Sequence, residues 1–120
     1  MQDGQQYTIR EVSEILKIPV RNLRYFCDNG LIPNVCQSQN GYRSVAGQHG
    51  DFIRLLNALQ LIDSSLEDLK RLSELYRKHG GIGVECQELL RTKKRQLWQK
   101  LTVIQDDISL IERYEEIFDK

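Results

Sequence analysis

The chain has 120 residues, 40% of them hydrophobic, and its 17 Lys and Arg balance 17 Asp and Glu to a formal net charge of zero. This length suits one compact domain with an appendage. Because the net charge is zero, the overall charge gives no support for a nucleic-acid partner, and any such case depends on local charge. No apolar run approaches the roughly 18 residues of a membrane span, and residues 1–6 are too polar for a signal peptide, so we expect a cytoplasmic protein with no membrane partner.

Two short helices are predicted near the start of the chain. Thr8 to Glu11 has the S/T-x-x-E pattern of a capping box, and apolar residues then recur at helical spacing, which predicts a helix over about 9–16. Pro19 suits the first turn of a second helix, and Gly30 suits its end. Two short helices joined by a tight turn predict a helix-turn-helix.

A hairpin and two further helices are predicted next. Asn34 to Arg43 holds Asn40-Gly41 between two short stretches that could pair, which predicts a β-hairpin, or wing. Helical spacing resumes from Asp51, and Ser64-Ser65 offers the N-cap of a fourth helix with acidic residues in its first turn. The glycine-rich stretch 79–83 predicts a flexible joint after it.

The last segment is predicted to be one long helix. It has no Gly or Pro through Lys120, and its apolar residues follow the alternating three- and four-residue spacing of a coiled-coil seam. A helix of about 34 residues is on the order of 50 Å long, more than a small domain covers, so a second copy is expected to bury the seam. The residues assigned to this dimer surface are Leu90, Leu97, Trp98, Leu101, Ile104, Ile108, Ile111 and Phe118. Trp98 and Tyr114 are expected to widen this dimer surface; the alternative is that they line an effector pocket near the joint.

Charge along this helix predicts how two copies would pair. Residues 91–100 carry five Lys and Arg and no acid, whereas acidic residues dominate 106–119. An antiparallel pair places each basic half on the partner's acidic half, whereas a parallel pair aligns like charges. An antiparallel homodimer is therefore expected.

Several short motifs occur in an order that carries a resemblance. They are Tyr7-Thr8-Ile9-Arg10-Glu11-Val12, Val20-Arg21-Asn22-Leu23-Arg24-Tyr25-Phe26, Gly30-Leu31-Ile32-Pro33, Asn40-Gly41-Tyr42-Arg43 and Ser65-Leu66-Glu67-Asp68-Leu69. This series resembles the N-terminal domain of the MerR family of transcription regulators, and the long helix resembles the family's antiparallel dimerisation helix. The fold expected is mostly α: a winged helix-turn-helix with a small β-hairpin wing, plus a long C-terminal dimerisation helix. The expected domains are 1–79 for DNA binding, 80–84 for a hinge loop and 85–120 for the coiled coil.

The sequence departs from the family pattern in three places. Val45 to Gly50 lacks the usual small capping residue and acidic opening of the third helix, so that helix is expected to start late or to be loosely held. Lys17 replaces a frequent Gly in the turn between the first two helices. Ile62-Asp63-Ser64 replaces the usual Leu-Gly-Phe/Tyr before the fourth helix.

The second helix of a helix-turn-helix enters the major groove, where outward side chains meet base edges and phosphates. Leu23 and Phe26 are expected to face inward, which leaves arginine, asparagine and tyrosine side chains of that helix for DNA. The resemblance adds the residues just past the wing turn, and the start of the first helix could offer backbone N–H groups to a phosphate. The predicted DNA-binding residues are Thr8, Val20, Arg21, Asn22, Arg24, Tyr25, Tyr42 and Arg43. A Tyr42 packed under the hairpin is the alternative for that residue.

The three cysteines, Cys27, Cys36 and Cys86, lack C-x-x-C spacing, so neither a disulfide framework nor a four-ligand zinc site is predicted. Cys86 falls where metal-sensing relatives carry one thiolate ligand, but this sequence shows none of their further ligands. No metal and no cofactor are expected, and Cys86 stays only a candidate thiol sensor. Cys27 and Cys36 are assigned to the packing of the second helix and the wing, with redox sensing as the alternative.

The expected function is a sequence-specific transcription regulator that binds a near-palindromic promoter operator as a dimer. The resemblance implies that it bends and untwists an overlong promoter spacer so that RNA polymerase engages both promoter elements. The expected partners are double-stranded DNA, a second copy and RNA polymerase. The alternative is an architectural or accessory DNA-binding protein, such as an excisionase or a chromosome-anchoring factor. A third hypothesis is a coiled-coil adaptor with no DNA role. No nucleophile–base or carboxylate pair suggests an enzyme.

Overall fold

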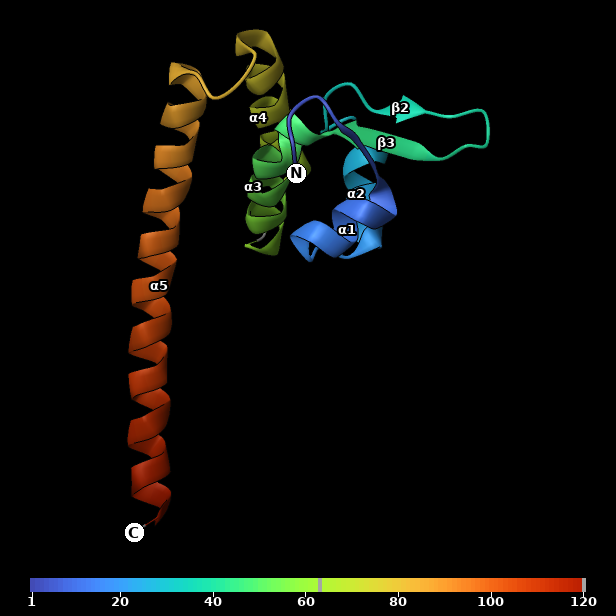
Figure 1. Ribbon diagram of the computed structural model, residues 1–120. Helices are drawn as coiled ribbons and strands as arrows, with labels where there is room; N and C mark the ends of the chain where they lie inside the picture. The colour runs from blue at the N-terminus through green and yellow to red at the C-terminus, as the bar shows by residue number, and fades with distance from the viewer. Residues whose placement is uncertain (63, 120) are drawn as a thin grey trace. The chain divides into compact units, whose positions relative to one another are not determined.

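The computed structural model describes residues 1–62 and 64–119 and divides into two compact units, Met1–Gly81 and Ile82–Lys120. The predicted departure at Asp63 and the end of the predicted coiled coil at Lys120 lie outside the described residues. The first unit contains β1 (Gln6–Thr8), α1 (Ile9–Leu16), α2 (Val20–Asp28), β2 (Cys36–Gln37), β3 (Arg43–Ala46), the 3-10 turn η1 (Gly47–His49), α3 (Gly50–Leu61) and α4 (Leu66–His79) (Figure 1). The second unit is α5 (Val84–Asp119). The mostly α fold with a small sheet is confirmed.

The helix-turn-helix forms as the sequence predicts. The Thr8 hydroxyl accepts from the Glu11 N–H at 3.2 Å while the Glu11 carboxylate accepts from the Thr8 N–H at 3.0 Å, so the capping box is complete. Lys17 then adopts the left-handed conformation with φ 59°, which costs a non-glycine residue about 1 kcal/mol and explains why glycine is frequent at this turn. Pro19 is the N-cap of α2 rather than its first residue.

The core of the first unit gathers the apolar faces of all four helices and the wing strand β3. Leu23 and Phe26 of α2 are fully buried, as predicted, which fixes the opposite face of that helix outward. Phe52 of α3 stacks on Tyr76 of α4, and α1 packs against α2, its neighbour in Figure 1. The largest fully buried apolar side chains of this unit are Val12, Leu23, Phe26, Leu31, Val45, Ile53, Leu56, Leu69 and Leu72.

The wing belongs to a three-stranded antiparallel sheet of order β1-β3-β2. The predicted hairpin is present, but its return strand continues to Ala46, beyond the expected end at Arg43. The turn is closed by the Gly41 N–H donating to the Ser38 carbonyl at 2.9 Å, with Gly41 at φ 82°. The strand β1 was not predicted, because it has only three residues and the last of them, Thr8, carries the capping signal of α1. It aligns Tyr7 with Val45 and so joins the wing to the start of the helix-turn-helix.

The residues before β1 cross the junction between the wing and α3. The Gly47 N–H donates to the Gln5 carbonyl at 2.8 Å, and the Gly4 N–H donates to the Gln48 side-chain oxygen at 3.2 Å. A Cβ at Gly47 would overlap the Gln2 carbonyl oxygen and lie 3.0 Å from the Tyr7 ring. The third helix follows a 3-10 turn and starts at Gly50, one residue before the expected Asp51. It has no side-chain N-cap, although Asp51 lies in its first turn.

A polar pair, the buried His49 and the half-buried Tyr76, joins this junction to α4. His49 is only 8% exposed, and its Nδ1 lies 2.9 Å from the Tyr76 hydroxyl. The Tyr76 ring in turn stacks on Phe52, with ring centroids 3.9 Å apart. His49 Nε2 is buried with no hydrogen-bond partner among the described residues. Burial lowers the pKa of His49 below its ordinary value, and the nearby Arg77 charge acts in the same direction.

Acidification is expected to destabilise the protein through His49. The unfolded chain takes up a proton at this side chain near its ordinary pKa of about 6.5, whereas the folded chain resists it, so stability is full above pH 6.5 and falls below it, by at most about 1.4 kcal/mol per pH unit. Urea unfolding at pH 7.5 and 5.5 measures this loss. His49→Asn keeps a polar atom for Tyr76 but does not titrate, so it should lose less stability over that interval. An equal loss in both proteins would contradict the prediction.

The second unit is a single uninterrupted helix. Its 36 residues, Val84–Asp119, correspond to a length of about 54 Å at 1.5 Å per residue. No helix among the described residues is long and apolar enough to cross a membrane.

Candidate nucleic-acid interface

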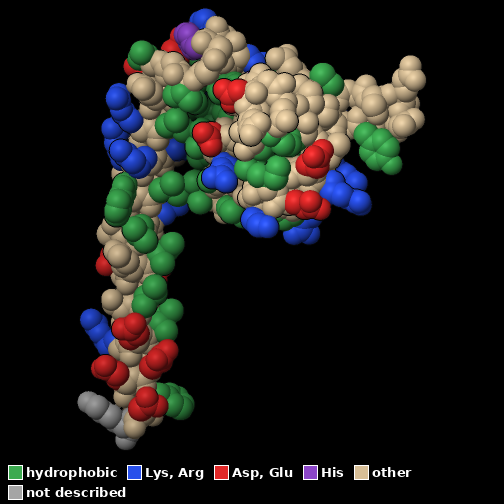
Figure 2. Space-filling model, viewed as in Figure 1, with side chains coloured by type: hydrophobic (Ala, Val, Ile, Leu, Met, Phe, Trp, Pro, Cys, Tyr) green, Lys and Arg blue, Asp and Glu red, His purple; other side chains and the backbone are tan. Residues whose placement is uncertain are grey.

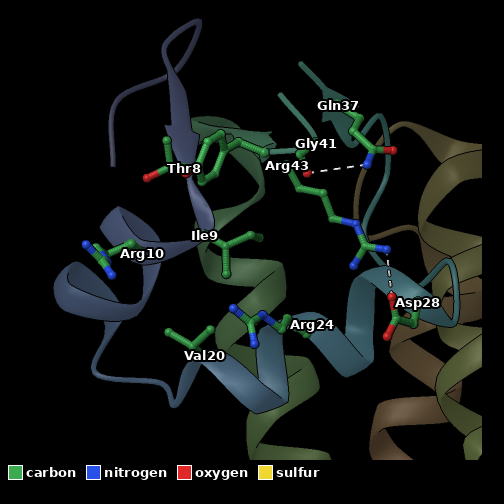
Figure 3. Close-up of a pocket in the computed structure, with 10 residues that line it drawn as sticks. Thr8, Ile9, Arg10, Val20, Arg24, Asp28, Gln37, Gly41 and Arg43 are labelled. Atoms are coloured by element: carbon green, nitrogen blue, oxygen red, sulfur yellow. Dashed lines mark hydrogen bonds and ion pairs between the residues drawn. The ribbon is translucent and has the colours of Figure 1, made fainter. Parts of the chain in front are cut away.

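A cleft of about 780 Å³ opens on the first unit between the start of α1, the outer face of α2 and the wing. It brings together Thr8, Val20, Arg24, Tyr42 and Arg43 of the predicted DNA-binding set. The remaining lining residues are Ile9, Arg10, Asp28, Gln37 and Gly41. Three separate segments of the chain thus contribute to one surface, which Figure 3 shows in close-up.

The cleft is locally basic although the chain is neutral. It is lined by Arg10 from α1, Arg24 from α2 and Arg43 from the wing, against the single carboxylate of Asp28. Arg10 and Arg24 are exposed. Arg10 was not among the predicted residues; its place in the first turn of α1, two residues after the Thr8 cap, was the signal that could have found it.

An ion pair links the wing to α2. The Arg43 guanidinium lies 2.7 Å from the Asp28 carboxylate, and Figure 3 shows the arginine reaching from the wing to the helix. The hydrogen bond to Asp28 raises the pKa of Arg43 above its ordinary value, so the guanidinium stays charged. Both side chains remain partly exposed, so we expect the pair to orient Arg43 more than to stabilise the fold.

Tyr42 lies on the open side of the wing. It is 70% exposed, so the alternative of a tyrosine packed under the hairpin is wrong. Its backbone N–H donates to the Ser38 hydroxyl at 3.2 Å, which fixes the residue at the end of the turn while the ring stays free. The ring and hydroxyl therefore face solvent at the rim of the cleft.

The other predicted residues of α2 lie outside this cleft. Arg21 is exposed, and Tyr25 is half exposed with its ring edge against Phe26. The Asn22 side-chain amide donates to the Asn57 side chain of α3 at 3.1 Å and is half buried. That hydrogen bond holds the Asn22 side chain against α3 in the chain without DNA.

The cysteines show no common site. Cys27 is half buried on α2, and burial raises the pKa of its thiol despite the nearby Arg43 charge. Cys36 is exposed on β2, so its assignment to the packing of the wing is wrong. Cys86 is a free, buried thiol in the first turn of α5. No group of three or more metal-ligating side chains gathers anywhere in residues 1–62 or 64–119.

The predicted seam of α5 is largely uncovered in the single chain. Trp98, Leu101, Ile104, Ile108, Ile111 and Phe118 are exposed, whereas Leu90 and Leu97 are half buried. A second apolar row, Val103, Leu110 and Ile117, is also exposed and was not predicted. Figure 2 shows hydrophobic side chains along the C-terminal half of the helix. The seven-residue spacing of this second row was visible in the sequence, but its positions lie outside the three- and four-residue alternation of the predicted seam.

Comparison with known proteins identifies the family. The family model of MerR helix-turn-helix regulatory proteins matches residues 7–75. An uncharacterised HTH-type transcriptional regulator of Haemophilus influenzae is 32% identical over 68 residues, which are 57% of this chain and 50% of that protein. This chain therefore matches only half the length of that relative.

Solved structures share the fold over nearly the whole chain. HiNmlR, a MerR family regulator lacking the sensor domain and bound to promoter DNA, aligns with a TM-score of 0.76 and 24% identity, over 97% of this chain and 92% of that one. A putative MerR family regulator of Listeria monocytogenes aligns with a TM-score of 0.75 and 22% identity, over 95% and 86% of the two chains. The family consists of transcription regulators, which are not enzymes. Because the family model covers more than half of the chain, this protein belongs to the MerR family of helix-turn-helix regulatory proteins.

Proposed function

We propose that this protein regulates transcription by binding double-stranded promoter DNA through the cleft of its first unit. The observation that carries the proposal is that three arginines from three segments, Arg10, Arg24 and Arg43, line one open cleft of an otherwise neutral chain. A guanidinium group binds phosphate or guanine through two parallel hydrogen bonds, so such a cluster suits a nucleic-acid duplex. The structural relative bound to promoter DNA supports the same use of the fold.

The roles of the residues follow from their positions. We assign α2 to the major groove, with Arg24 and Arg21 to base edges or phosphates and Val20 to apolar contact with a thymine methyl. Tyr42 and Arg43 of the wing, and Arg10 beside Thr8, would contact the phosphate backbone on either side. Tyr25 can donate its hydroxyl to a phosphate. Asn22 would also contact DNA, in place of its hydrogen bond to Asn57.

The second unit would join two copies of the chain, and so two DNA-binding clefts, in one dimer. We assign DNA binding to residues 1–79, a hinge to 80–84 and an antiparallel coiled coil to 85–120, so that a homodimer reads a near-palindromic operator. The exposed seam of α5 supports this assignment. Acting in the cytoplasm, the dimer would bend and untwist the promoter spacer for RNA polymerase, a deformation that costs several kcal/mol and that phosphate contacts would have to offset.

Replacing Arg24 with alanine is expected to weaken operator binding by about 10- to 100-fold, because one well-placed arginine contributes about 1–3 kcal/mol at a base pair. The operator would first be selected from genomic fragments, and affinity measured by fluorescence anisotropy at fixed salt. Arg71→Ala removes an exposed arginine of α4 that does not line the cleft and should change affinity less than about twofold. Full binding by both Arg24→Ala and Arg43→Ala would refute the proposal and favour a coiled-coil adaptor.

An architectural or accessory DNA-binding protein remains the second candidate, because the same surface could serve it. A footprint separates the two functions. Protection between the two elements of a promoter supports regulation. Protection confined to recombination or chromosome-anchoring sites would instead assign the protein to the accessory class.

A further inference from the structure

One face of α4 holds the end of the helix assigned to the major groove. The Ser73 hydroxyl donates to the Leu31 carbonyl at 2.7 Å in a buried hydrogen bond. Arg77 Nη2 donates to the Gly30 carbonyl at 2.5 Å and to the Ile32 carbonyl at 3.2 Å. Two side chains of α4 therefore hold three successive carbonyl groups that directly follow α2.

These carbonyls belong to the loop that ends α2. The Leu31 N–H donates to the Phe26 carbonyl at 2.9 Å, and Gly30 adopts φ 66°, so the chain turns sharply where the helix stops. Hydrogen bonds from a packed neighbour restrict the movement of the loop that ends α2.

The same face of α4 also holds the end of the wing. Tyr76 lies on this face, three residues from Ser73 and next to Arg77, and its hydroxyl is 2.9 Å from His49 Nδ1. His49 belongs to η1, directly after the wing strand β3. One helical face therefore contacts the segments that follow α2 and β3, the two elements that supply Arg24 and Arg43.

We propose that Ser73, Tyr76 and Arg77, the positioning face, set the angle between α2 and the wing and thereby the sequence specificity of DNA binding. None of the three lines the cleft, so they would act without touching DNA. Base readout requires side chains held to within about 0.5 Å, whereas phosphate contacts by long flexible arginines tolerate larger displacements. Loosening the positioning face should therefore weaken binding to the operator more than binding to unrelated DNA. The inference rests on the proposed function.

The test compares two duplexes of equal length on one preparation of the full chain: the selected operator and a scrambled version. Arg77→Met removes the donors but keeps an apolar stem, Arg77→Lys keeps the charge with a single ammonium, and Arg71→Met is the matched control on the exposed side of α4. Ser73→Ala removes the buried hydroxyl independently. Because both duplexes are titrated against the same sample, a partly unfolded fraction lowers both affinities equally and leaves their ratio unchanged.

We expect Arg77→Met and Ser73→Ala to lower the ratio of operator to scrambled affinity by about tenfold, the size of one mismatched base pair, while scrambled DNA binds within about twofold of the original chain. Arg77→Lys should recover part of the ratio, and Arg71→Met should leave it intact. An unchanged ratio in both Arg77→Met and Ser73→Ala would overturn the inference while leaving DNA binding in place. A parent chain without any sequence preference would overturn the proposed function together with it.

Discussion

Replacing Gly47 with alanine is expected to lower the free energy of unfolding by about 3 kcal/mol, the upper end of the cost of inserting an atom into a packed site. The added Cβ would overlap the Gln2 carbonyl oxygen and approach the Tyr7 ring. Because the obstacle is backbone, no side-chain rotation relieves it. Either the segment before β1 detaches and loses its hydrogen bonds to Gly47 and Gln48, or the junction between the wing and α3 shifts. Urea unfolding measures the difference.

Two controls isolate the overlap from a general effect of alanine. At Gly50 a Cβ would meet only the flexible Met1 side chain, with Sδ at 3.3 Å, and alanine favours a helix by about 1 kcal/mol over glycine, so Gly50→Ala should be close to neutral. Removing residues 1–4 removes the Gln2 carbonyl itself. In that shortened chain, Gly47→Ala should cost less than about 1 kcal/mol. A full cost in the shortened chain would show that the overlap is not its cause.

The parts of the fold that depend on local signals were predictable from the sequence. The Thr8 capping box, the inward pair Leu23 and Phe26, and the turn at Asn40-Gly41 each depend on residues within one or two turns of chain, and the structure confirms all three. The basic cleft could be predicted in part for the same reason, because Arg24 and Arg43 fall inside recognisable motifs.

Features that depend on distant contacts were not predictable. The strand β1 exists because Tyr7 pairs with Val45, 38 positions away, and three residues show no alternation of their own. In the sequence, Gly47 was only part of a departure from the family pattern. The structure shows that the Gln2 carbonyl lies against it and leaves no room for a side chain. The Asn22 side chain is hydrogen-bonded to Asn57, 35 positions away, and no local pattern around either residue indicates that contact.

Introducing a charge into the seam of α5 is expected to give the largest effect on function. Ile108→Asp places a carboxylate among apolar side chains that a partner helix would desolvate, and burying an unpaired charge opposes association strongly. The dimer should become a monomer in sedimentation or light scattering. Operator affinity should then fall by about 100-fold or more, because the two DNA-binding units no longer bind as one ligand.

The matched control is Ser109→Asp, the neighbouring exposed position, which adds the same charge outside the three- and four-residue alternation of the seam. It should remain a dimer and keep its affinity for the operator. The second apolar row offers a sharper comparison, since Val103→Asp tests whether the interface is wider than the seam. A dimer that survives Ile108→Asp but dissociates with Val103→Asp would move the interface to the row of Val103, Leu110 and Ile117. A dimer that survives both would remove α5 as the source of dimerisation.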